Sequence, residues 1–322
     1  MKRKDNLYEE ICKIENIMQA FDEVCRNTRN RRKVNKFKDF RCMYVSTIYR
    51  ILKEKSYVVG PYNVFTIYEP KKRRIVSQGM IDKIINHLVA RHILMPSVIP
   101  GLIDQNVASR VGMGTQKGIS YLNKYRNSCA CKYGQYYILK CDVSSFFASI
   151  DQQRLKEKLK RRIKETEALK IVFDIIDSEE QGLGIGNMTS QILAIFYLND
   201  MDHFIKEVLK IKYYIRYQDD FLLMHPSKEY LKVCLTKIRQ FLKKEKLTLN
   251  KKTRLYKNTD NFIFLGRSLS GKYAKYRQIY RRLKKRKYLY SIGSISLMSY
   301  ASSIVCYQYL NCTKIKMKKL QE

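Results

Sequence analysis

Apolar residues recur at helical spacing through the first part of the chain. The recurring positions are Leu7, Ile11, Ile14, Met18, Phe21 and Val24. Spacings of three and four residues place them on one face of an α-helix, so the pattern predicts an amphipathic helix that ends near the basic run 29–33. A second helix is expected over 40–55. The apolar faces of such helices pack into a core, and we assign them no chemistry.

Shorter apolar runs that are rich in aromatic and β-branched residues predict strands. They occupy 64–68, 75–76, 136–141, 213–215 and 221–224. Helical patterns occupy 80–95, 151–170, 191–209 and 230–246. The segment 151–170 is so rich in charge that we expect a solvated helix there. The strands are expected to form an antiparallel sheet covered by helices, which is an α+β fold.

Two adjacent carboxylates separate the last two apolar runs. The tetrad Tyr217, Gln218, Asp219 and Asp220 has the position of a tight β-hairpin connection. Adjacent carboxylates repel each other, and in a core they are unfavourable unless a divalent cation or another positive charge lies against them. A polar hairpin turn is the alternative, because Asp is a common turn residue.

A third carboxylate, Asp142, directly follows the strand-like run 136–141. Two-metal phosphoryl transfer requires carboxylates from separate strands that converge on ions roughly 3.5–4 Å apart. Asp142 and Asp219 supply such a pair. The sequence therefore predicts a centre for phosphoryl transfer at the ends of two strands.

At this point the chain resembles reverse transcriptases, through five motifs in the expected order. They are Asp142 with Phe147, then 186–191, 217–220, 249–253 and 264–266. The resemblance implies a right-hand polymerase with fingers, a palm and a short basic helical thumb, acting as an RNA-directed DNA polymerase. Its segments would be an N-terminal helical extension over 1–68, fingers over 69–125, a palm over 126–266 and a basic thumb over 267–322.

The resemblance also implies roles for the residues of the centre. Asp142, Asp219 and the Val143 carbonyl would bind two Mg²⁺ ions, which suit hard carboxylate oxygens, and Asp220 would support that metal site more than bind directly. Lys252 would donate a proton to the departing pyrophosphate. Phe147 would be a steric gate that rejects a 2′-hydroxyl and so selects deoxynucleotides, whereas a core Phe beside Phe146 is the alternative.

Further residues would contact the dNTP substrate and the nucleic acid. Those implied for the nucleotide are Arg73, Lys83, Arg110, Val143, Phe147, Ile185, Gly186, Ser190 and Gln191. An ordinary surface cation is the alternative for each of the three basic residues. Those implied for the template RNA and the RNA/DNA duplex are Tyr217, Leu265, Gly266, Arg281, Arg282, Lys284, Lys285, Arg286 and Lys287.

The charge supports a polyanionic partner. The 322 residues include 64 Lys and Arg against 29 Asp and Glu, which gives a net charge of +35. A field of that size is typical of proteins that neutralise phosphates. After Asp260 no acid occurs until Glu322, and the run 281–287 suits a thumb laid along a duplex; a solvated basic helix or tail is the alternative.

The cysteines and the hydropathy indicate the cellular compartment of the protein. Nine Cys lack the paired spacing of a zinc site, so we expect buried or free thiols. No signal peptide and no apolar stretch long enough for a bilayer is expected, and we predict a cytoplasmic protein without membrane contact.

A finer resemblance is to the enzymes of diversity-generating retroelements, which copy a template RNA with errors at adenines. It is carried by 182–191, where Ile185 and Gln191 replace the Gln and Pro of most reverse transcriptases, and by 15–21, 106–115 and 197–204. An apolar Ile185 lacks the polar contacts of an amide, which favours misincorporation. The resemblance also implies a small basic accessory protein as partner.

Three other functions compete with this interpretation. A bacterial antiphage-defence reverse transcriptase would share the same chemistry. A group II intron maturase would need more chain after Gly266 than is present here. A nucleic-acid-binding protein with an inactive polymerase fold is the non-enzymatic alternative, but binding alone does not require clustered carboxylates beside phosphates.

Overall fold

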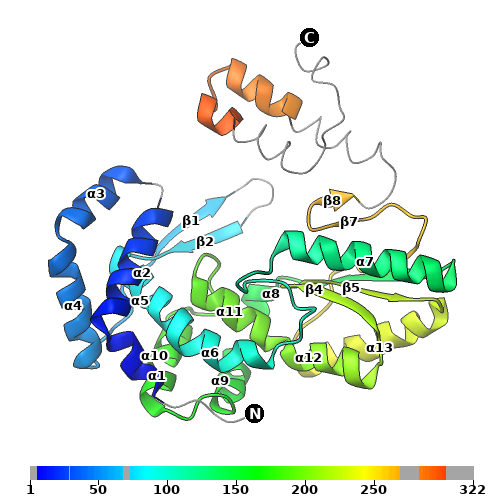
Figure 1. Ribbon diagram of the computed structural model, residues 1–322, viewed down its shortest axis with the longest axis horizontal. Coiled ribbons are helices and arrows are strands. Elements are labelled where there is room, and N and C mark those ends of the chain that lie inside the picture. The colour runs from blue at the N-terminus through cyan, green and yellow to red at the C-terminus, as the bar shows by residue number, and fades with distance from the viewer. Residues whose placement is uncertain (1–5, 29, 68–72, 269–282, 302–322) are drawn as a thin grey trace. The chain divides into compact units, whose positions relative to one another are not determined.

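The computed structural model describes residues 6–28, 30–67, 73–268 and 283–301. The chain divides into two compact units, Met1–Leu255 and Tyr256–Glu322. The first unit holds the helices and the sheet around which the site forms (Figure 1). Within the described ranges, every helix is too short or too polar to cross a lipid bilayer.

Four helices open the first unit, where the hydrophobic pattern predicted two. They are α1 (Leu7–Cys12), α2 (Ile14–Asn27), α3 (Arg31–Asp39) and α4 (Arg41–Lys53). The expected continuous helix from 7 to 24 was wrong, because Lys13 is extended, with φ −69° and ψ 129°. This break changes which face of α2 is buried: Phe21 is fully buried, whereas Ile14 is 47% exposed.

A β-hairpin and a long helical segment follow. Strands β1 (Asn63–Ile67) and β2 (Arg73–Ser77) pair antiparallel, with Phe65 opposite Ile75. The helical segment comprises α5 (Met80–Leu88), a π-helical turn (Val89–Leu94), α6 (Met95–Val98) and a 3₁₀ turn (Ile99–Gly101). After a loop the chain enters α7 (Thr115–Tyr133), a helix of 19 residues that the apolar pattern did not indicate.

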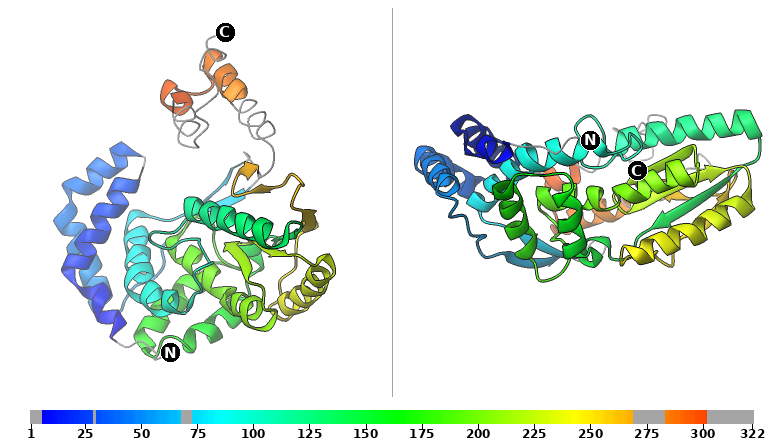
Figure 2. Two further views of the ribbon diagram at one scale, coloured as in Figure 1. Left: turned by 45° about the vertical axis from the view of Figure 1, so that its right-hand side comes forward. Right: turned by 90° about the horizontal axis from the view of Figure 1, so that it is seen from below.

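The central sheet has four strands in the order β4-β5-β3-β6. They are β3 (Tyr137–Asp142), β4 (Tyr213–Tyr217), β5 (Asp220–His225) and β6 (Arg254–Lys257), and β5 pairs antiparallel with both β3 and β4. Figure 2 shows α7 and α13 (Lys228–Lys244) on opposite sides of this sheet. The two central strands are therefore buried on both faces, as their apolar runs require.

The charged segment 151–170 is two helices, so the single solvated helix was also wrong. It contains α9 (Gln152–Lys160) and the start of α10 (Thr166–Asp177). The Asp151 carboxylate caps α9 by accepting from the Arg154 N–H at 2.8 Å. The side chain of Lys158 is only 11% exposed, because its Nζ lies 2.7 Å from an Asp200 carboxylate oxygen and 3.2 Å from one of Glu245.

The rest of the first unit places the loops around the sheet. Short α8 (Phe146–Ser149) follows β3, and α11 (Met188–Tyr197) leads into α12 (Asn199–His203) and a π-helical turn (Phe204–Val208). Helix α11 is buried on most of its surface, in agreement with the apolar pattern over 191–209.

The second unit begins within β6. Its described part contains the small hairpin β7 (Ile263–Phe264) and β8 (Arg267–Ser268), whose turn residues Leu265 and Gly266 have φ of 49° and 74°. Two consecutive positive φ values are typical of the tight turns that join antiparallel strands. Residues 283–291 are helical.

Candidate active site

The sheet brings the three predicted carboxylates to one end of two adjacent strands. Asp142 ends β3 and is directly opposite Asp220, the first residue of β5. Asp220 also pairs with Tyr217 across the β4-β5 turn, and the Val143 N–H donates to the Asp219 carbonyl at 3.2 Å. Acids that are far apart in the sequence thus become cross-strand neighbours.

Burial and mutual repulsion shape the electrostatics of this end. Burial raises the pKa of the Asp220 carboxyl to about 6, Lys140 opposes that increase, and the charges of Asp142 and Asp219 add to it. The Lys140 Nζ lies 3.1 Å from Asp220 Oδ1, and the two side chains are 21% and 24% exposed. Sequence reasoning missed Lys140, although a Lys in an apolar strand two residues before Asp142 was a visible signal.

The carboxylates at this end are candidate ligands for a metal ion. Among the described residues, no group of three or more His, Cys, Asp and Glu side chains is placed to hold one ion. Mg²⁺ generally uses one or two carboxylates and completes its shell with waters and substrate phosphates. Asp142 and Asp219 would supply two carboxylates to such a site, whereas Asp220 lies against Lys140.

The loop that carries Lys252 is attached to the backbone of Asp142. The Asn250 N–H donates to the Asp142 carbonyl at 2.7 Å, and the Ser144 N–H donates to the Thr248 carbonyl at 2.8 Å. The Asn250 side chain then accepts from the Lys252 N–H at 3.1 Å, which holds a turn. Lys252 is exposed on this turn, beside the end of β3.

The two neighbouring Phe residues have different environments. Phe146 is 2% exposed and belongs to the core, whereas Phe147 is half-buried, with the ring centroids 5.7 Å apart. The Phe147 carbonyl accepts from the Leu183 N–H at 2.8 Å. Gly182 permits this approach: its φ is +64°, and a Cβ there would lie 2.3 Å from the Phe147 oxygen.

The segment before α11 is fastened to β2. The Ile185 carbonyl accepts from the Val76 N–H at 3.1 Å. Gly186 has φ +132°, and a Cβ there would lie 2.8 Å from the Val76 oxygen. Ser190 is buried, and the exposed Gln191 accepts from the Ser109 hydroxyl at 3.2 Å. The strand of the first hairpin thereby fixes the backbone of the nucleotide motif.

The three basic residues expected at the triphosphate do not share one environment. Lys83 lines a cavity of about 210 Å³ with Gly186 and Asn187. Arg110 donates to the carbonyls of Ile103 and Asn106, at 2.9 and 3.0 Å, and so holds its own loop. Arg73 begins β2, but its side chain lies outside the described part of the structure.

The residues expected along the duplex are only partly described. Tyr217 is half-buried at the end of β4. Leu265 and Gly266 form the turn of the small hairpin, and Lys284, Lys285, Arg286 and Lys287 are exposed on the helix 283–291. Arg281 and Arg282 lie outside the described residues.

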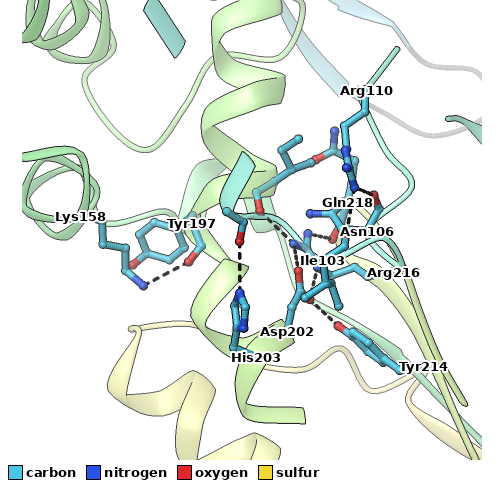
Figure 3. Close-up of polar contacts among 12 residues, drawn as sticks. Ile103, Asn106, Arg110, Lys158, Tyr197, Asp202, His203, Tyr214, Arg216 and Gln218 are labelled. Atoms are coloured by element: carbon cyan, nitrogen blue, oxygen red, sulfur yellow. Dashed lines mark hydrogen bonds and ion pairs between the residues drawn. The ribbon is translucent and has the colours of Figure 1, made fainter. Parts of the chain in front are cut away.

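A buried ion pair that sequence reasoning missed holds the carboxylate hairpin (Figure 3). Arg216 on β4 and Asp202 on α12 are both 0% exposed, and two hydrogen bonds of 2.7 and 2.6 Å join them. Arg216 also donates to the Gln218 carbonyl at 2.9 Å and to the Ile195 carbonyl at 2.9 Å. The guanidinium thus joins α11, α12 and the turn that carries Asp219.

Tyr214 and Gln218 make two further hydrogen bonds around this ion pair and the turn. The Tyr214 hydroxyl donates to Asp202 Oδ1 at 2.6 Å, and burial followed by the Asp202 charge raises the pKa of Tyr214 well above its ordinary value. The Gln218 side chain donates to the Ser109 hydroxyl at 2.9 Å. Arg216 was overlooked because a single charge at a strand end resembles a solvated residue.

The chain belongs to the reverse transcriptase family, because the family model described as reverse transcriptase (RNA-dependent DNA polymerase) matches residues 51–269. No curated protein sequence matches it. The chain is similar in fold to telomerase from Candida tropicalis in complex with a TWJ fragment of telomeric RNA, at a TM-score of 0.53 and 13% identity over 89% of this chain and 59% of that one.

Two other telomerase structures give the same result. Apo telomerase from Candida tropicalis, truncated from its C-terminal domain, has a TM-score of 0.52 and 16% identity over 68% of this chain and 56% of that one. Telomerase from Candida albicans with the TWJ fragment has a TM-score of 0.52 and 15% identity over 73% and 48%. The chain thus spans about half the length of these proteins, and the likeness is one of fold.

We predict that breaking the buried ion pair destabilises the protein strongly. Asp202→Leu or Arg216→Met alone should lower the free energy of unfolding by about 3–5 kcal/mol, because each leaves an unpaired buried charge. The double variant should lose much less than the sum of the two. Urea unfolding followed by circular dichroism measures these values.

A surface pair provides the control. Lys232 and Glu229 lie 3.0 Å apart with side chains 57% and 75% exposed, and Glu229→Gln should change the stability by about 1 kcal/mol or less. Additive losses in the Asp202 and Arg216 variants would contradict the assignment of a coupled pair.

Proposed function

We propose that the protein is an RNA-directed DNA polymerase that extends a primer with deoxynucleotides on an RNA template. The observation that carries the proposal is the cross-strand placement of Asp142 beside the Asp219-Asp220 turn, in a chain of the reverse transcriptase family. The reaction joins the primer 3′-oxygen to the α-phosphorus and releases pyrophosphate. Mg²⁺ ions at Asp142, Asp219 and the Val143 carbonyl would stabilise both the attacking and the leaving oxygen.

The residues of the chain have separate tasks in this proposal. Lys140 neutralises Asp220, which keeps a third negative charge from competing at the centre. Phe147 lies half-buried beside the end of β3 and limits the space under the sugar. Lys252, exposed on a turn attached to Asp142, donates a proton to the departing pyrophosphate. Gly186, Ser190 and Gln191 hold the incoming nucleotide and its template base.

The proposed segments follow the expected polymerase order. The N-terminal helical extension covers 1–68, the fingers 69–125, the palm 126–266 and the basic thumb 267–322. The exposed cations Lys284, Lys285, Arg286 and Lys287 support contact between the thumb and a duplex backbone.

We infer further that the enzyme serves a diversity-generating retroelement, with a small basic accessory protein as partner. The residue that supports this finer role is Ile185, whose backbone is held by Val76 while its side chain offers no hydrogen bond to a base. Base selection at this position then depends on shape, which tolerates errors.

We predict that Asp142→Asn or Asp219→Asn abolishes Mg²⁺-dependent synthesis. Each substitution removes a ligand charge but keeps the side-chain shape, so synthesis should fall by at least about a hundredfold while folding is retained. Extension of a labelled primer on an RNA template is the measurement. Asp177→Asn on α10 is the matched control and should retain full activity; normal synthesis by the Asp142 or Asp219 variant would remove the site assignment.

Phe147→Val should admit ribonucleotides, because the shorter side chain leaves space for the 2′-hydroxyl. We expect the preference for dCTP over CTP in single-turnover incorporation to fall by about tenfold or more. Phe147→Tyr keeps the ring and should keep the preference. If Phe147→Val discriminates as the parent does, the ring has only a packing role.

Ile185→Gln should lower misincorporation opposite template adenine. The new amide can orient the nucleotide and its template base, and one hydrogen bond is worth about 1 kcal/mol, or roughly a fivefold change in error frequency. Deep sequencing of products from one RNA gives the error rates, with Ile185→Leu as the apolar control. Identical adenine errors in all three proteins would remove the physical reason for the diversity-generating role over antiphage defence.

A further inference from the structure

Helix α3 presents a basic surface in the N-terminal helices, at the other end of the first unit from α13 (Figure 1). Its cations Arg31, Arg32, Lys36 and Lys38 are exposed, and the helix contains one acid, Asp39, at its end. Among the described residues, none of these four cations has an acidic partner. The positive charge of α3 is therefore available to a ligand.

Two acids on the preceding helix α2 are already paired. Asp22 on α2 accepts from Arg41 at 2.9 Å, and Glu23 accepts from Arg91 at 2.7 Å. These pairs keep two carboxylates of α2 from neutralising α3. A row of unpaired cations is the usual feature that binds a phosphate backbone.

Aromatic side chains accompany the cations. Phe37 is 7% exposed and stacks on Tyr44, with ring centroids 3.8 Å apart, which anchors α3 to the helices below it. Phe40, the residue after α3, is 51% exposed, and Met43 is 53% exposed. An exposed ring among cations suits the stacking of an unpaired base better than the backbone of a duplex.

A cavity continues this surface toward the fingers. It has a volume of about 390 Å³ and is lined by Lys36, Phe37, Tyr44 and residues 79–82. The lining includes one carboxylate, that of Asp82, whose Oδ1 accepts from the Tyr57 hydroxyl at 2.9 Å and the Gly60 N–H at 3.1 Å. These two hydrogen bonds weaken the repulsion between the Asp82 carboxylate and a phosphate.

The cavity of about 210 Å³ near the nucleotide motif is lined by residues that are adjacent in sequence to those of the first cavity. Ser77 and Gln78 line that second cavity, together with Gly186, Asn187 and Met188. Gly79 and Met80, which follow directly, line the first. The junction between β2 and α5 thus borders both cavities, one beside the nucleotide motif and one beside α3.

We propose that α3, Phe40 and the adjoining cavity bind the unpaired segment of the RNA template that has not yet been copied. The four cations contact its phosphates, and Phe40 stacks on one of its bases. This inference rests on the proposed function, because it assigns the template base to the Gly186 segment and leads the uncopied 5′ strand from there across the β2–α5 junction. The template is thereby held on the enzyme ahead of the reacting nucleotide.

The test compares binding of two RNA/DNA duplexes by fluorescence anisotropy without dNTP. One duplex has a 5′ RNA overhang of about 12 nucleotides, within the range of single-strand binding sites, and the other is blunt. The variant carries Arg31→Gln, Arg32→Gln, Lys36→Gln and Lys38→Gln. Its affinity for the overhang duplex should fall at least about tenfold, with a salt dependence flattened by roughly 0.7 per lost contact, and its affinity for the blunt duplex should stay within about twofold of the parent's.

A matched variant controls for charge alone. Lys228→Gln, Lys237→Gln, Lys243→Gln and Lys244→Gln remove four exposed cations from α13. This variant should bind the overhang duplex nearly as the parent does. An equal loss in both variants, an equal loss on the blunt duplex, or parental affinity in the α3 variant would each overturn the proposal.

Substitutions at Phe40 separate stacking from charge. Phe40→Ala should weaken binding of the overhang duplex by about fivefold or more, whereas Phe40→Tyr should restore it, since a ring is kept. Equal affinities of the Ala and Tyr variants would overturn the stacking role.

Primer extension on a template with a two-nucleotide overhang separates this proposal from the proposed function. The α3 variant should extend that primer at the parental rate, because so short an overhang does not reach α3. A parent that binds the long overhang through α3 but never extends the primer would refute the polymerase activity and leave the binding surface standing.

Discussion

The placement of the carboxylates depends on one buried ion pair. Arg216 and Asp202 are fully buried, so their charges must satisfy each other, and the guanidinium uses its remaining donors on the Gln218 and Ile195 carbonyls. Gln218 has a positive φ of 56°, which a non-glycine residue adopts only with support. Asp219 follows directly, and its own carbonyl accepts from the Val143 N–H. A fully buried pair thus supports the turn that carries the more exposed Asp219 and Asp220.

Backbone hydrogen bonds, and not the motif side chains, hold the remaining motifs. Asp142 is joined to Asn250, Phe147 to Leu183, and Ile185 to Val76, each through main-chain atoms. These hydrogen bonds do not use the side chains at the three positions. This separation explains how an apolar Ile185 is compatible with otherwise complete motifs, because the bond from Val76 uses only its carbonyl.

Local patterns predicted the central strands and the hairpin because period and turn chemistry act over a few residues. The breaks at Lys13 and after Lys160, and the polar helix α7, have no signal in the apolar pattern. Contacts between residues distant in sequence also support helix ends: Glu165, for example, accepts from the N–H of Leu7 and Tyr8 at the start of α1. The site was predicted as a set of acids. Of its supports, Lys140 was visible as a Lys within an apolar run, whereas Arg216 required knowledge of which strands are buried.

A basic run in the sequence is not always a basic surface. Helices α3 and α9 are both rich in Lys and Arg, yet Lys156 and Lys158 of α9 pair with acids on α10 and α12, whereas the exposed cations of α3 pair with none among the described residues. At a net charge of +35 the whole protein attracts nucleic acid. Single-stranded nucleic acid is commonly bound where unpaired cations lie beside exposed aromatic rings, and in the first unit α3 with Phe40 has both features.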